Sequence, residues 1–188
     1  MLLDELELRE PVAVAGLSMG GYVAFEVLRQ GPDRVRALGL FSTRAAPDSA
    51  EQRQGRLKLV ERIQQEGMGV LAETVAPKLT GPTTASIRPD LLADITRWAL
   101  AASPQGVTDA LRAMAGRADS RPLLGSIACP TLVVAGREDL VIPSADMEAM
   151  AAAIPGAQFD SIPDAGHLVN LEQPERFHEI LARWLRQL

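Results

Sequence analysis

The chain has 188 residues, of which 47% are hydrophobic and 23% charged, and it carries a net charge of −5. These values fit a globular protein with one core and an appended lid, and the negative charge argues against a nucleic-acid partner. No apolar run is long enough to span a membrane and no secretory signal is visible, so a cytoplasmic protein without a membrane partner is expected.

The first predicted elements are a short apolar strand over Val12–Ala15 and an amphipathic helix over Gly20–Arg29. Between them lies Gly16-Leu17-Ser18-Met19-Gly20-Gly21, a Gly-x-Ser-x-Gly nucleophile elbow with one extra glycine. Small residues are needed there because the serine backbone is strained and strand and helix pass close together. The pattern predicts Ser18 as a nucleophile.

A second strand is predicted over Val35–Phe41, and no strand pattern follows it between Thr43 and Leu124. That region instead has helical periodicity near Ser49–Glu66, Val70–Leu79, Pro89–Ala101 and Pro104–Gly116, with a break at Gly81-Pro82. We therefore expect a helical block over residues 44–121, between the two parts of the chain that carry the predicted strands, residues 1–43 and 122–188.

Two further strands are predicted over Thr131–Ala135 and Gln158–Ile162, followed by an amphipathic helix over Pro174–Leu188. All four strands are short and apolar, as in a mainly parallel sheet covered on both faces. The predicted fold class is therefore α/β, with about four strands flanked by helices.

A serine nucleophile needs a base, and the base needs an acceptor that orients it. The chain has two histidines. His167 lies in a glycine-containing loop after a predicted strand, whereas His178 lies among charged residues on a predicted helix, so His167 is the favoured base.

The favoured acid is Asp139, which follows the strand Thr131–Ala135 and so lies where parallel sheets build their sites. Glu138 is adjacent and is the alternative acid. Asp164 is near His167 in sequence, and its expected role is to shape the turn.

The order Ser18, Asp139, His167 is the order found in α/β hydrolases. The elbow, the segment Pro130–Asp139 and the segment Ala165–Glu175 together resemble the α/β-hydrolase superfamily. The resemblance is greatest to the branch with 3-oxoadipate enol-lactonases, carboxylesterases and cofactor-free haloperoxidase-like enzymes. It implies that residues 44–121 are an inserted lid.

The resemblance also implies what is absent before the elbow. The family has several strands ahead of the nucleophile strand, and Met1–Leu8 resembles the end of the helix that precedes it. The His-Gly type loop, which supplies one N–H of the oxyanion hole, is missing, so the Met19 N–H is the one identifiable donor. The chain is expected to be the C-terminal part of an N-terminally truncated α/β hydrolase.

These features predict a serine hydrolase that acts on a carboxylic ester, a lactone or a related acyl bond of a small molecule. Perhydrolysis and C–C bond cleavage use the same three residues and stay open. The alternative is a truncated, catalytically impaired fragment that forms a homodimer along its exposed sheet edge. No cofactor or metal is expected, because Cys129 and the two histidines do not cluster at ligand spacing.

Overall fold

The computed structural model describes residues 2–188 and contains a four-stranded sheet in the order β1-β2-β3-β4. All three strand pairs are parallel. The strands are β1 (Val12–Leu17), β2 (Val35–Phe41), β3 (Thr131–Gly136) and β4 (Gln158–Ile162). The predicted α/β class with about four parallel strands is confirmed.

Successive residues of the central strands point into two separate cores. On one face, Leu38 and Leu40 of β2 join Val133 of β3 and the helices α2, α8 and α9. On the other face, Phe41 and Val134 join α10 and α11. This alternation is the two-residue period of a strand, and it explains why β3 is apolar and buried along its whole length.

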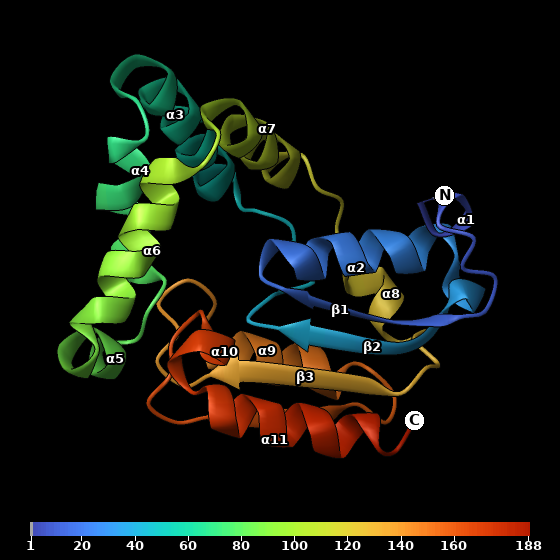
Figure 1. Ribbon diagram of the computed structural model, residues 1–188. Coiled ribbons are helices and arrows are strands. Elements are labelled where there is room, and N and C mark those ends of the chain that lie inside the picture. The colour runs from blue at the N-terminus through green and yellow to red at the C-terminus, as the bar shows by residue number, and fades with distance from the viewer. Residues whose placement is uncertain (1) are drawn as a thin grey trace.

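The helices that cover the sheet lie on both of its sides, with α2 and α11 on opposite ones (Figure 1). Trp184 on α11 is almost fully buried, as the helical spacing of apolar residues predicts. The bounds are α2 (Met19–Gln30), α8 (Arg121–Leu124), α9 (Ser144–Ala152), α10 (Val169–Glu172) and α11 (Pro174–Leu185), with α1 (Leu2–Glu5) and the 3-10 turn η1 (Pro32–Arg34) before β2.

The helices within residues 50–115 stand beyond the carboxyl ends of the strands (Figure 1). They have small apolar clusters of their own, one joining Val60 and Ile63 to Leu111, another joining Ala76 to Leu91 and Ile95. Their bounds are α3 (Ala50–Glu66), α4 (Gly69–Thr74), the 3-10 turn η2 (Ala76–Lys78), α5 (Pro82–Ile87), α6 (Pro89–Ala101) and α7 (Pro104–Ala115).

One sequence expectation in this region is wrong. The predicted helix over Val70–Leu79 is divided into α4 and η2, because Pro77 has no N–H to continue the α-helical hydrogen bonds. The chain does break at Gly81, as predicted, but Pro82 then starts the short helix α5, which the sequence analysis did not predict. Proline is tolerated in the first turn of a helix because the N–H groups there have no partner within the helix.

Strand β1 forms one edge of the sheet within residues 2–188, since it pairs with β2 alone. Ala13 and Ala15 are exposed and Gly16 is the one buried residue of β1, whereas β3 is buried throughout. An apolar strand with one open edge is a template for pairing with another strand. Among residues 2–188, no helix is long and apolar enough to cross a membrane. The cytoplasmic location of the protein stays a prediction.

Gly136 provides a test of how tightly the end of β3 packs. A Cβ atom at Gly136 would overlap the carbonyl oxygen of Gly166, while a Cβ at Gly55, inside α3, would meet open space. We expect Gly136→Ala to lower the free energy of unfolding by about 2 kcal/mol or more. Gly55→Ala should raise it by about 0.5–1 kcal/mol.

Urea denaturation followed by circular dichroism measures both changes. A Gly136→Ala protein as stable as the wild type would contradict the tight contact between β3 and the loop before His167.

Candidate active site

Ser18 lies in the turn between β1 and α2 and has a φ of 53°, a left-handed conformation that is uncommon for serine. Hydrogen bonds hold this turn. The Ser18 N–H donates to the Phe41 carbonyl at 2.8 Å, and the Ser18 carbonyl accepts from the Thr43 hydroxyl at 2.8 Å and from the Gly21 N–H at 3.0 Å. The end of β2 therefore fixes the backbone that presents the Ser18 hydroxyl.

Two of the three glycines of the elbow are required because neighbouring atoms leave no room for a side chain. A Cβ at Gly16 would overlap the backbone of Gly20, and a Cβ at Gly21 would overlap the side chain of Thr43. Gly20 itself faces open space. Strand and helix thus approach each other most closely at Gly16, as the Gly-x-Ser-x-Gly pattern predicts.

The structure brings together the three side chains that the sequence singled out. The Oγ of Ser18 lies 2.7 Å from Nε2 of His167, and Nδ1 of His167 lies 2.8 Å from Oδ2 of Asp139. His167 is 2% exposed and Asp139 is 8% exposed. The resulting hydrogen-bond chain starts on the elbow and ends on the loop after β3.

Asp139 is held in place by backbone amides. Its Oδ1 accepts the N–H of Val141 at 2.7 Å and the N–H of Ile142 at 2.9 Å. An ionised carboxylate can only accept, so Oδ2 takes the N–H of His167 Nδ1. The lone pair of Nε2 then faces the Ser18 hydroxyl, which is the tautomer that a general base needs.

The alternative candidates lie elsewhere. Glu138 accepts the N–H and the hydroxyl of Thr83 at 2.9 and 2.6 Å, so it contacts α5 rather than His167. His178 is exposed on α11. Asp164 is exposed in a left-handed turn with a φ of 53°, as expected for a residue that shapes the turn before His167.

The sequence analysis missed Glu172, which is 4% exposed. Its carboxylate accepts the N–H of Gly166 at 2.9 Å and the N–H of Leu168 at 3.1 Å, the two amides that flank His167. It also accepts the N–H of Gly81, ahead of α5, at 2.8 Å. The available signal was an acidic residue five positions after His167, in a stretch where three of the four intervening residues are apolar.

The Met19 N–H is the first amide of α2 and has no partner within the helix. It follows Ser18 directly, at the positive end of the helix dipole. This is where a negative charge developing near the Ser18 hydroxyl would be stabilised.

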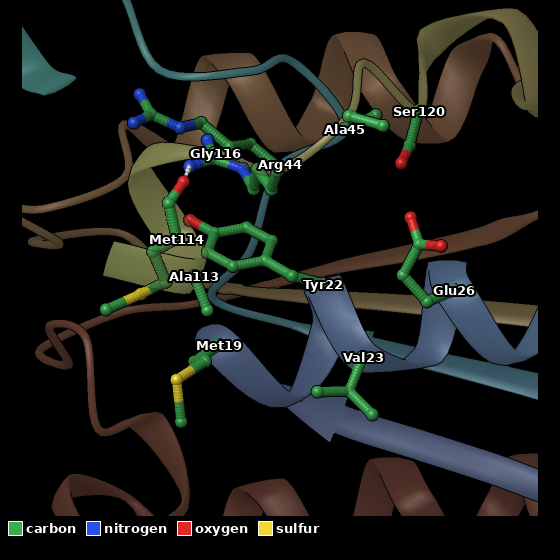
Figure 2. Close-up of a pocket in the computed structure, with 12 residues that line it drawn as sticks. Met19, Tyr22, Val23, Glu26, Arg44, Ala45, Ala113, Met114, Gly116 and Ser120 are labelled. Atoms are coloured by element: carbon green, nitrogen blue, oxygen red, sulfur yellow. Dashed lines mark hydrogen bonds between the residues drawn. The ribbon is translucent and has the colours of Figure 1, made fainter. Parts of the chain in front are cut away.

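A pocket of about 520 Å³ lies between the triad and the helices that follow β2. Ser18 and His167 line it together with apolar side chains of α3, α4 and α7, including Leu59, Leu71 and Leu111. A second pocket, of about 440 Å³, adjoins it and shares Met19, Tyr22, Arg44 and Met114. Tyr22 and Glu26 of α2 face Arg44, Ala45 and Ser120 across this second pocket (Figure 2).

Asp48 contacts Arg44 and Arg117, two residues that line these pockets, and its side chain is fully buried. Burial alone would raise its pKa, but hydrogen bonds from Arg56 and Arg117 and their charges outweigh this effect and lower the pKa below its usual value. Asp48 is therefore ionised at neutral pH. No group of three or more His, Cys, Asp or Glu side chains within residues 2–188 is placed to hold a metal ion.

Comparison with known proteins places this geometry in a family. Residues 2–180 match the model of the alpha/beta hydrolase family. The chain is 34% identical to 3-oxoadipate enol-lactonase 1 of Acinetobacter baylyi, covering all of this chain and 68% of that protein. It is 29% identical to 3-oxoadipate enol-lactonase 2 of the same organism, covering 94% of this chain and 64% of that one.

A solved structure of a thermophilic esterase from Thermogutta terrifontis, with malate bound, matches with a TM-score of 0.95 and 45% identity. The match covers 99% of this chain and 68% of the esterase. The chain thus spans about two thirds of the length of these relatives. The matched residues and the shared fold show that the chain belongs to the alpha/beta hydrolase family.

Proposed function

We propose that this chain carries the catalytic triad of a serine hydrolase that cleaves carboxylic esters or lactones. The observation that carries the proposal is the hydrogen-bond chain from Ser18 Oγ through His167 to Asp139, with separations of 2.7 and 2.8 Å. The names of the relatives, an esterase and two enol-lactonases, support the same class of bond.

In the proposed reaction, His167 Nε2 accepts the Ser18 proton as Oγ attacks the ester carbonyl. The tetrahedral intermediate collapses when the same Nε2–H donates its proton to the leaving oxygen, which releases the alcohol and leaves an acyl group on Ser18. Water then gives a proton to Nε2 and attacks the acyl carbonyl. Return of that proton to Oγ releases the acid and restores the enzyme.

Asp139 orients the imidazole and stabilises its charged form during both steps. The Met19 N–H supports the developing oxyanion, assisted by the dipole of α2. Residues 2–188 offer this one identifiable donor of the oxyanion hole, and loss of one donor typically costs about 10²–10³-fold in turnover.

Residues 44–121 are proposed to act as the cap of this site, over a core formed by residues 1–43 and 122–188. The lining of the pocket supports this role, because α3, α4 and α7 line the pocket that contains Ser18 and His167. A cap of this kind limits water access and shapes the space for a small substrate.

Replacement of the nucleophile tests the proposal directly. Ser18→Ala should lower kcat for p-nitrophenyl acetate by about 10⁴-fold or more, because no other group can form the acyl intermediate. A fluorophosphonate probe should label the wild type and fail to label Ser18→Ala. Ser126→Ala, which removes an exposed hydroxyl bonded to the Leu123 carbonyl, is the matched control and should react normally.

Equal hydrolysis by the wild type and Ser18→Ala would remove Ser18 from this role.

Replacement of the acid distinguishes Asp139 from its neighbour. Asp139→Asn should lower kcat by about 10⁴-fold, because an amide cannot hold His167 in the tautomer that accepts the serine proton. Glu138→Gln is the matched control, and its effect on kcat should be less than about threefold, since Glu138 contacts Thr83. Stopped-flow or steady-state assays with one ester measure kcat for both variants. A larger loss of kcat in Glu138→Gln than in Asp139→Asn would assign the role of the acid to Glu138.

A second candidate is favoured by the open edge of β1. In this view the chain is a catalytically impaired hydrolase fragment that is stabilised by pairing of two copies along this edge. A well-folded protein that the fluorophosphonate probe does not label would favour this candidate.

Light scattering coupled to size-exclusion chromatography tests the pairing itself. The second candidate predicts a mass twice the 20.2 kDa of the chain. Ala13→Lys, which places a charge on the exposed part of β1, should shift the mass toward one copy, while Ala152→Lys on the exposed side of α9 should not. A monomer at every concentration would count against self-association.

A further inference from the structure

The loop that carries His167 is buried, although it has no regular secondary structure. It lies between β4 and α10, and Ala165, Gly166 and His167 are all buried. Buried backbone N–H groups need a hydrogen-bond partner, and this segment lies outside the strands and helices that would supply one. The position of His167 therefore depends on the groups that accept hydrogen bonds from the amides of this loop.

The carboxylate of Glu172 accepts the two amides that flank the base. It binds the N–H of Gly166 at 2.9 Å and the N–H of Leu168 at 3.1 Å. Glu172 is the last residue of α10, so its side chain turns back toward the loop that precedes its own helix. An ionised carboxylate only accepts hydrogen bonds, so it is matched to a set of N–H groups. The backbone on both sides of His167 is thus held by one buried side chain.

The same carboxylate connects this loop to the wall of the pocket. Its Oε2 also accepts the N–H of Gly81 at 2.8 Å, and the Leu79 carbonyl accepts the N–H of Leu168 at 3.1 Å. A Cβ atom at Gly166 would lie 2.1 Å from the backbone nitrogen of Gly81, so the two segments are in direct backbone contact. Leu79 lines the pocket that contains the triad. The loop of the base and this part of the pocket wall therefore share one acceptor.

We infer that Glu172 is a positioning residue for the general base. Its carboxylate fixes the loop backbone so that Nε2 of His167 stays within hydrogen-bond reach of Ser18 Oγ. Glu172 does not line the pocket, and the bonds that its carboxylate accepts within residues 2–188 come from backbone amides, so it acts through the loop. Misplacement of a reacting group by about 1 Å costs about 10²-fold in rate. The inference rests on the proposed function, because His167 is the base of that reaction.

Two variants of Glu172 remove different numbers of these hydrogen bonds. In Glu172→Gln one oxygen can still accept from Gly81 and Gly166, as Oε2 does, but the NH2 group then faces the N–H of Leu168, donor against donor. Glu172→Leu offers no acceptor to any of the three amides. We expect kcat for p-nitrophenyl acetate to fall about tenfold in Glu172→Gln and about 10²-fold in Glu172→Leu, with KM changed by less than about twofold.

Glu138→Gln is the matched control. Glu138 also accepts hydrogen bonds from the start of α5, at Thr83, but its carboxylate does not hold the amides that flank His167. Its kcat should stay within about threefold of the wild type. Urea denaturation of each protein shows that kcat is measured on folded chains, and Glu172→Gln carries the test alone if Glu172→Leu does not fold.

Proton NMR reports the position of the base without turnover. The Nδ1–H of His167 is buried against Asp139 and should give a downfield signal in the wild type. We expect this signal to broaden or move upfield in the folded Glu172 variants and to stay in place in Glu138→Gln. A residue that only stabilises the fold would lower the urea midpoint when replaced, but would leave both the signal and kcat of the folded protein unchanged.

An unchanged kcat in every folded Glu172 variant would overturn the inference, as would a loss of kcat/KM that comes wholly from a higher KM. Failure of the proposed function gives a different result. In that case the wild type neither hydrolyses the ester nor reacts with the fluorophosphonate probe, whereas the His167 signal still changes when Glu172 is replaced.

Discussion

The parallel alignment of all four strands, β1 to β4, is the constraint on which the site depends. Because these strands run in one direction, their carboxyl ends meet at one edge of the sheet, and the loops that follow them meet there too. Ser18 and His167 are separated by 149 positions in the chain, yet their side chains are in hydrogen-bond contact. The β2 strand is indispensable in this arrangement, since the Phe41 carbonyl and the Thr43 hydroxyl hold the backbone of Ser18.

Two buried or half-buried carboxylates connect the helical region after β2 to the same edge. Glu172 binds the amides on both sides of His167 and the amide of Gly81, and Glu138 binds Thr83. The backbone around His167 and the start of α5 therefore share their hydrogen-bond acceptors. Displacement of these helices would leave buried N–H groups unsatisfied, so the position of the helices and the position of the base are energetically coupled.

The sequence was most informative where the chemistry is local. The strand Val35–Phe41 and the helix Pro89–Ala101 have the predicted bounds, because apolar periodicity and flanking glycine or proline determine them. Prediction failed at Pro77 and Pro82, where one residue type both ends and starts helices. It also missed Glu172 and the arginines around Asp48, since Arg117 lies 69 positions from Asp48 and only tertiary structure brings them together.

In the proposed reaction, the elbow and the wall of the pocket contribute in different ways. A contact with a part of the substrate far from the reacting carbon is the same in the bound substrate and in the transition state, so it stabilises both about equally. The charge that appears on the carbonyl oxygen is new, and the Met19 N–H and the dipole of α2 act on it alone. On the proposed function, selectivity among esters therefore depends on the side chains of α3, α4 and α7 that line the pocket, whereas the rate of acyl transfer depends on the end of β1. Because the elbow directly follows the strand with the open edge, a strand paired with β1 would, on the same proposal, change the rate more than the selectivity.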